Sequence, residues 1–273
     1  AREVTMRLMF LAALVWLATT TYSHACAIPI KGQLVQGGLL TGRVVSGTPV
    51  SVMGKPVRVS TEGLFLLAFG RDATQPVELK AGSVSCMLQP QKRVYKISRI
   101  DGLPPRKVSP RAPEDLARIR AENAAIRDVR RVDSPATDFA GGFRWPLTGR
   151  LSGVFGAQRI LNGKPRRYHN GVDIAAPIGT PIVASAPGRV VLVHEDMFFA
   201  GKTVILDHGH GLTSVYIHMS AITVKERQRV ETGGMIGRVG MTGRASGPHL
   251  HWGVTLFGTH VDPQLLAGPM PTK

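Results

Sequence analysis

A chain of 273 residues is long enough for one large domain or two modest ones, each with a hydrophobic core. A hydrophobic fraction of 43% excludes intrinsic disorder, and the 31 glycines and 19 prolines disfavour a helix bundle and favour strands joined by turns. The formal charge of +16 predicts attraction to polyanions such as an anionic cell envelope, whereas the lack of zinc-finger spacing or a recognition-helix pattern disfavours nucleic acid as a partner.

Residues 1–25 have the pattern of a secretory signal peptide. Two arginines precede the apolar run Leu8 to Ala18, and the segment Ser23-His24-Ala25 has small residues at the two key positions. The apolar run is shorter than the ~20 residues that a membrane-spanning helix needs. We therefore expect export across the inner membrane, cleavage after Ala25 and no membrane span in the mature chain.

The two cysteines are Cys26 and Cys86. In an oxidising compartment such a pair predicts a disulfide rather than a metal site. Removal of the signal peptide would leave Cys26 first in the mature chain, so its lipidation is an alternative, although Ser23 and His24 fit a lipidation motif poorly. Two free thiols are the third possibility.

Short apolar runs separated by turn residues fill residues 26–98. The turn signals Gly47-Thr48-Pro49, Gly54-Lys55-Pro56 and Glu62-Gly63 recur at about the 8–12-residue interval that is typical of β-sandwiches. We expect a small β-sandwich-like domain with a binding or spacer role, because it contains no catalytic cluster. The expected strands are residues 39–45, 50–52, 57–59, 64–68 and 77–79.

Residues 99–140 are rich in proline, arginine and lysine, a composition that predicts a basic, proline-rich linker. Within it, Pro113 followed by two acidic residues is a helix start, and the helix is expected to run to about Arg131. Its partial apolar stripe indicates one amphipathic helix that packs on a domain, and the alternative is a basic arm that contacts an anionic polymer. The stripe consists of Leu116, Ile119, Ile126 and Val129.

Residues 141–273 return to short strands and glycine turns, without a long helix, so the whole chain is predicted to be mainly β. Seven of the nine histidines fall between His169 and His251. Three clusters there fit a zinc site, because imidazole and carboxylate suit Zn²⁺ and a catalytic site keeps three protein ligands with water in the fourth position. The clusters are His169-x-x-x-Asp173, Tyr216-Ile217-His218 and His249-Leu250-His251.

The period of a strand explains the last cluster. Side chains two residues apart point to the same face of a sheet, so His249 and His251 can both face one cleft. One of them can bind metal with His169 and Asp173 while the other faces substrate. The other histidines after the signal peptide are interpreted as ordinary structural residues, with a glycine-rich turn at residues 207–211. They are His194, His208, His210 and His260.

The motif Tyr168-His169-Asn170-Gly171-Val172-Asp173 resembles the first metal motif of the lysostaphin-like peptidoglycan endopeptidases. Residues 209–220, 233–237 and 239–252 resemble the remaining signatures of that family, in the same order, and residues 143–156 resemble the opening of its catalytic module. The resemblance covers about half of the chain and implies a C-terminal antiparallel β metallopeptidase domain over residues 141–273. The upstream β domain is similar to the companion domain of Gram-negative envelope members.

Carried over position by position, the resemblance implies that His169, Asp173 and His251 bind one zinc ion. It places His218 and His249 beside the metal's water as polarising or transition-state-stabilising groups. The family cuts glycine bridges or peptide stems that contain alanine and diaminopimelate, and the signal peptide favours the periplasmic stem cross-link as the substrate.

Two other classes of function remain open. The first is a catalytically silent scaffold of the same fold that activates a cell-wall amidase, which the complete set of candidate ligands disfavours. The second is a cationic module that binds carbohydrate or nucleic acid without hydrolysis.

Overall fold

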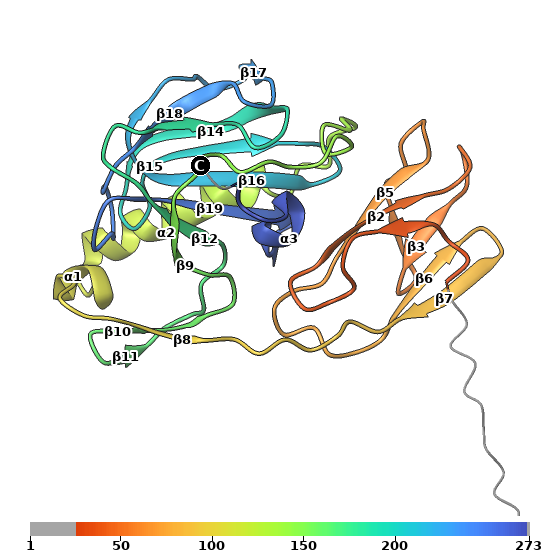
Figure 1. Cartoon of the computed structure of the whole chain (residues 1–273), viewed down its shortest axis with the longest axis horizontal. Helices are drawn as coiled ribbons and strands as arrows, with labels where there is room; N and C mark the ends of the chain where they lie inside the picture. The colour runs from red at the N-terminus through yellow and green to blue at the C-terminus, as the bar shows by residue number, and fades with distance from the viewer. Residues whose placement is uncertain (1–25, 272–273) are drawn as a thin grey trace, which may run out of the picture.

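The computed structural model describes residues 26–271, so the predicted signal peptide lies outside the described residues. The protein is mainly β, as the composition predicts, with a smaller β domain at the N-terminal end and a larger antiparallel domain after it (Figure 1). Within residues 26–271 no helix is both long and apolar enough to cross a membrane.

Seven short strands form the N-terminal domain: β1 (Ile30–Lys31), β2 (Leu39–Arg43), β3 (Val50–Val52), β4 (Lys55–Val57), β5 (Leu64–Ala68), β6 (Val77–Ala81) and β7 (Val84–Leu88). Strands β1, β2 and β5 make one sheet, and β4, β3, β6 and β7 make another. Leu40 and Phe65 from the first sheet and Leu79 from the second share one buried core. This confirms the predicted β-sandwich-like architecture.

The two cysteines form a disulfide in this domain. Cys26 and Cys86 are joined by an S–S bond of 2.05 Å, which ties the segment before β1 to strand β7. A sulfur in a disulfide cannot also carry a lipid, so among the three possibilities from sequence the structure selects the disulfide.

Ten strands build the main sheet of the C-terminal domain: β9 (Arg150–Gly153), β12 (Val172–Ala175), β13 (Pro181–Val183), β14 (Gly188–Met197), β15 (Gly201–Asp207), β16 (Leu212–Ile222), β17 (Arg229–Val230), β18 (Met235–Val239), β19 (His249–Leu256) and β20 (Thr259–Val261). Seven of these strands lie side by side in the order β17-β14-β15-β16-β19-β12-β9, and every neighbouring pair is antiparallel. The central strands β16, β19 and β12 position the candidate site.

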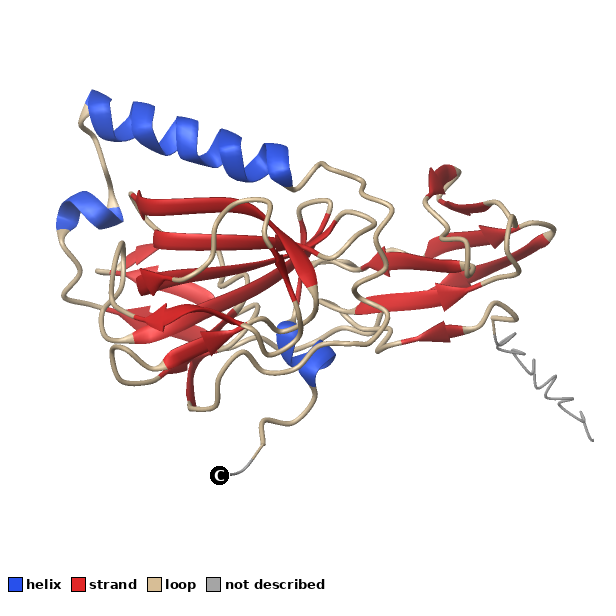
Figure 2. Cartoon of the chain, turned by 90° about the horizontal axis from the view of Figure 1, so that it is seen from above, coloured by secondary structure: helices blue, strands red, loops and turns tan. Residues whose placement is uncertain are grey.

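The two faces of this sheet are covered differently. One face carries the main core, in which Trp252 and Tyr216 are fully buried. Helix α2 (Pro113–Val129) lies over the other face (Figure 2), where Ile126 and Val129 pack with Leu192 of β14. The predicted helix therefore exists, begins at the predicted proline, and packs on the C-terminal domain. Only Ile126 and Val129 of the predicted stripe lie in this packed cluster, and Leu116 is exposed.

The structure contains short elements that the sequence did not predict. Strand β8 (Ile97–Ile100), at the start of the linker, pairs in parallel with β10 (Gln158–Leu161) of the C-terminal domain, which forms a hairpin with β11 (Lys164–Pro165). Helix α1 (Pro105–Val108) lies in the linker, and helix α3 (Pro263–Ala267) lies near the C-terminal end. Each of these elements spans five residues or fewer, too short for a recognisable period.

His208 is a structural residue of the core, as the sequence interpretation held. Its ring is fully buried, Nδ1 donates to the carbonyl of Pro187 (2.5 Å), and Nε2 accepts from the hydroxyl of Ser214 (2.7 Å). Burial lowers the pKa of His208 below its ordinary value, so the native ring is neutral.

Protonation of His208 should therefore destabilise the fold. Its native pKa lies below the unfolded value of about 6.5, so the unfolded state binds more protons below that pH, and the stability from the neutral ring is lost as pH falls. We expect the unfolding free energy of His208→Gln to fall less steeply than that of the wild type between pH 7 and 5, by up to about 1.4 kcal/mol per pH unit. Urea unfolding at several pH values measures this, and parallel curves would contradict it.

Candidate metal centre

Three donor atoms converge on one point at the central strands. Asp173 of β12 lies directly opposite His251 of β19 in the antiparallel ladder, and His169 precedes β12 in the same motif. Oδ1 of Asp173 lies 2.9 Å from Nε2 of His169 and 2.8 Å from Nδ1 of His251, and the two nitrogens are 2.8 Å apart. All three side chains are buried.

This donor set fits a zinc ion. Two imidazole nitrogens and one carboxylate oxygen are ligands that Zn²⁺ takes at roughly 2.0–2.2 Å, and their mutual separations are compatible with sharing one ion. Three protein donors leave a fourth position for water or substrate. Among residues 26–271 this is the one group of three or more His, Cys, Asp or Glu side chains so arranged.

Backbone carbonyls fix the tautomers of three histidines. Each carbonyl can only accept, so the Nδ1 atom facing it carries the proton and a neutral ring keeps its Nε2 lone pair free. The contacts are His169 with Val154 (3.0 Å), His218 with Thr242 (2.8 Å) and His249 with Gly247 (2.8 Å). The rings are thus preset to present Nε2 to the site.

The carboxylate of Asp173 is held from both sides. Its Oδ2 accepts from Nη2 of Arg159 (2.8 Å), which leaves Oδ1 facing the two imidazoles. Burial alone would raise the pKa of Asp173, but hydrogen bonds and attraction from His169 and His251 outweigh it and keep that pKa well below its ordinary value. On the neighbouring strand a Cβ at Gly153 would lie 2.4 Å from Oδ2, so a glycine there makes room for the carboxylate.

His218 and His249 border the donor cluster, where the sequence predicted them. Their ring centroids are 4.8 Å apart, and Nε2 of His249 is 3.7 Å from Oδ1 of Asp173. Burial, with repulsion from His249 and His251, lowers the pKa of His218 to about 3, and burial lowers that of His251 to about 4. Both rings are therefore neutral near pH 7.

His218 reaches the site through a β-bulge. By strict alternation it would share the core face of Tyr216, but two residues of β16, Ile217 and His218, oppose the single residue Thr203 of β15. His218 has a φ of 65°, in the left-handed region that favours glycine, and its N–H donates to the carbonyl of Ala200 (2.9 Å). The bulge turns its ring beside His249.

The other histidines lie outside the cluster, as predicted. His194 accepts from the backbone of Asp196, and His260 contacts the side chain of Asn170. Sequence reasoning missed Arg159, the partner of Asp173. The pair Asn162-Gly163 is a strong hairpin signal that would have placed Arg159 in a strand close to the metal motif.

Comparisons with known proteins identify the family of the C-terminal domain. The sequence model of Peptidase family M23 matches residues 167–263. A putative peptidase M23 from Pseudomonas aeruginosa, known from its crystal structure, is 34% identical, covers 86% of this chain and 96% of its own, and has a TM-score of 0.67.

Two curated relatives match the same region. The peptidoglycan DD-endopeptidase ShyA of Vibrio cholerae serotype O1 is 42% identical over 133 residues, which are 48% of this chain and 31% of the relative. The DD-carboxypeptidase/endopeptidase Mpg of Neisseria meningitidis serogroup B is 38% identical over 122 residues, 45% and 28% of the two chains. The match thus spans about a third of the length of these curated relatives.

The left-handed backbone at His218 makes a testable difference between two substitutions. Both His218→Gly and His218→Ala remove the imidazole, but only glycine adopts a φ of 65° without strain. We expect the glycine variant to be more stable by about 1 kcal/mol in urea unfolding. At the neighbouring Ile217 the order should reverse, with alanine the more stable. Equal stabilities of the two His218 variants would argue against the strained bulge.

Proposed function

We propose that this chain, which belongs to peptidase family M23, is a zinc-dependent endopeptidase that hydrolyses peptide cross-links of bacterial peptidoglycan. The observation that carries this proposal is the convergence of a buried His-Asp-His donor set with two further imidazoles at one point. The relatives ShyA and Mpg, which carry endopeptidase names, support the same reaction class.

In this proposal His169, Asp173 and His251 hold one zinc ion. When bound, zinc supplies Lewis acidity, which activates water and polarises a peptide carbonyl. The protein contributes the fixed geometry: Asp173 is ionised and anchored by Arg159, and His169 is held in the required tautomer by the carbonyl of Val154.

His218 and His249 are proposed to act on the reacting peptide. Each presents an Nε2 lone pair, because its Nδ1 proton is committed to a backbone carbonyl. Such a nitrogen can accept a proton from the attacking water and return it to the leaving amine. A ring that carries the proton can also donate a hydrogen bond to the oxygen of the scissile carbonyl as charge develops there.

The periplasm is the proposed compartment. The disulfide between Cys26 and Cys86 is of a kind that persists in oxidising compartments, and the signal-peptide pattern of residues 1–25 predicts export. The net charge of +16 favours residence near an anionic envelope polymer.

Digestion of purified peptidoglycan tests the function directly. The protein should release muropeptides with a cleaved cross-link, identified by mass, because the donor set supports metal-assisted hydrolysis. A chelator should abolish release, and added zinc should restore it. Protein that carries zinc, cleaves nothing, and only stimulates an added amidase would instead establish the scaffold function.

The two histidines of β19 should separate metal binding from turnover. His251→Ala removes a proposed ligand, so zinc content and activity should be lost together, whereas His249→Ala should keep most zinc and lose about 100-fold or more in kcat. Zinc analysis and kinetics on the same preparations measure both. His194→Ala, which changes a histidine outside the cluster, should match the wild type. Equal zinc loss in both β19 variants would show that the ligands are assigned wrongly.

A further inference from the structure

Three arginines gather beside the metal centre. Arg159 and Arg166 lie opposite each other on the hairpin of β10 and β11, where the N–H of Arg166 donates to the carbonyl of Arg159 (2.9 Å). Arg244 lies in the loop before β19, two residues after Thr242, whose carbonyl holds His218. Like charges opposite each other on antiparallel strands are destabilising. An anion bound between the guanidinium groups would relieve their repulsion.

Few acidic side chains of the protein pair with these three arginines. Arg159 is paired with Asp173, whose other oxygen faces His169 and His251. Arg166 and Arg244 form no ion pair with an acidic residue in the part of the chain that the structure describes. One carboxylate, already shared with two imidazoles, is therefore left to balance three guanidinium groups.

The present partners of the two unpaired guanidinium groups are neutral. Nη2 of Arg166 donates to the hydroxyl of Ser109 (2.6 Å), while its Nε is buried without a hydrogen-bond partner. Nη1 of Arg244 donates to the carbonyl of Lys107 at 3.3 Å, and the guanidinium lies 4.4 Å from the ring centroid of Phe199. A guanidinium group has five N–H donors, so Arg244 retains free donors for a carboxylate.

The electrostatics of Arg244 agree with this picture. Burial, together with repulsion from Arg159 and Arg166, lowers its pKa to about 10. The three charges thus interact in a partly buried setting, where screening by salt is weak.

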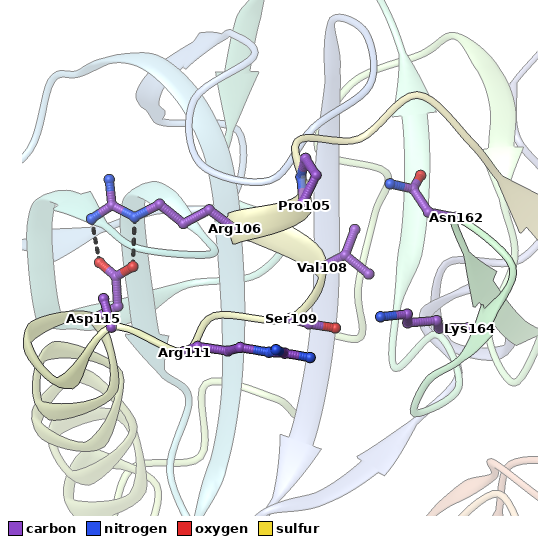
Figure 3. Close-up of a pocket in the computed structure, with 9 residues that line it drawn as sticks. Pro105, Arg106, Val108, Ser109, Arg111, Asp115, Asn162 and Lys164 are labelled. Atoms are coloured by element: carbon purple, nitrogen blue, oxygen red, sulfur yellow. Dashed lines mark hydrogen bonds and ion pairs between the residues drawn. The ribbon is translucent and has the colours of Figure 1, made fainter.

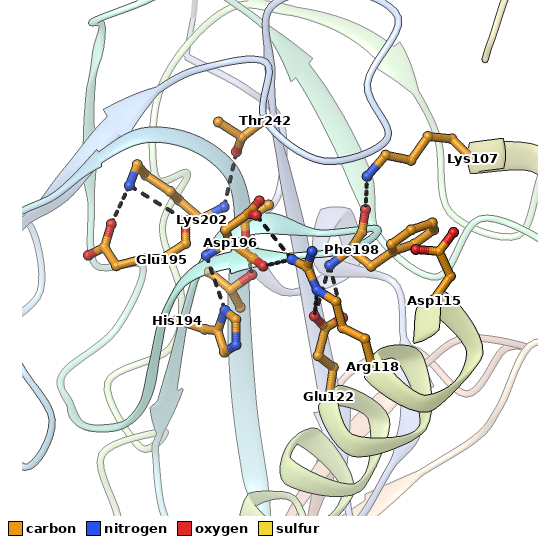
Figure 4. Close-up of polar contacts among 12 residues, drawn as sticks. Lys107, Asp115, Arg118, Glu122, His194, Glu195, Asp196, Phe198, Lys202 and Thr242 are labelled. Atoms are coloured by element: carbon orange, nitrogen blue, oxygen red, sulfur yellow. Dashed lines mark hydrogen bonds and ion pairs between the residues drawn. The ribbon is translucent and has the colours of Figure 1, made fainter. Parts of the chain in front are cut away.

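A basic pocket adjoins the cluster. It has a volume of about 530 Å³ and lies between α1 and the β10–β11 hairpin (Figure 3). Arg106 at its edge is neutralised by Asp115, whereas Arg111 and Lys164 have no acidic partner among the described residues. Lys107 of α1 donates to the carbonyl of Phe198 (Figure 4), so α1 also contacts the turn between β14 and β15.

We propose that Arg159, Arg166 and Arg244 form a carboxylate-binding subsite that selects peptides with a free carboxylate next to the scissile bond. Guanidinium forks match carboxylates geometrically, and Arg244 against an aromatic ring is oriented for such a contact. This inference rests on the proposed function and deepens it. A stem cross-link through diaminopimelate has a carboxylate on the carbon that bears the scissile nitrogen, whereas an internal bond of a glycine bridge has none.

Two matched substrates test the subsite. One is a cross-linked muropeptide dimer with free diaminopimelate carboxylate, and the other is the same dimer with that carboxylate converted to a carboxamide. We expect the wild type to prefer the free acid by about 10- to 100-fold in kcat/KM, the range of a charge-assisted hydrogen bond. In R244Q and in R166Q this ratio should fall towards 1, mainly through KM for the free acid.

R120Q provides the matched control, because Arg120 is exposed on α2 and its replacement changes the net charge equally. R120Q should keep the wild-type ratio of the two kcat/KM values. R244K, which keeps the positive charge, should keep part of that ratio. If the wild type cleaves both dimers equally, the subsite is disproved while the proposed function stands. If it cleaves neither dimer nor any other peptidoglycan cross-link, the proposed function itself fails. A preference that R244Q and R166Q leave unchanged would also overturn the subsite.

Discussion

The register between β12 and β19 is the constraint on which the site depends. It sets Asp173 opposite His251, so that carboxylate and imidazole meet at 2.8 Å on one face while Trp252 is buried on the other. Because side chains alternate along a strand, a slip of one residue would turn His251 into the core and place Trp252 on the face that carries the donor atoms. The burial of Trp252 and its neighbours therefore stabilises the fold and the metal geometry through the same pairing.

Contacts from the N-terminal domain reinforce the loop that carries His169. Tyr168, the preceding residue, donates its hydroxyl proton to Asp72, and its ring lies under the guanidinium group of Arg71 at 4.2 Å. A second link is the ion pair of Arg93 with Asp262 (2.8 Å), whose carboxyl also caps α3. The N-terminal domain thus contacts the segment that carries His169, a contact that the sequence did not predict.

The sequence predicted the elements whose signals are local and periodic. Alternation placed His249 and His251 on one face, and Pro113 marked the start of α2. It could not predict that His218 leaves the face of Tyr216, since a bulge depends on how β16 pairs with two different neighbours. The contact of Arg159 with Asp173 was likewise missed, because it depends on a hairpin docked on the parallel strand β8, a long-range pairing without a sequence period.

The positive charge of the chain acts at two distances. Exposed lysines and arginines favour the proposed attraction to anionic polymer. Their field is screened beyond about 8 Å at physiological salt, so they cannot distinguish one peptide from another. Arg166 and Arg244 are partly buried and hold neutral acceptors that a carboxylate would outcompete. The proposed attraction to the envelope and the proposed choice of bond therefore rest on different arginines, and salt should weaken the first far more than the second.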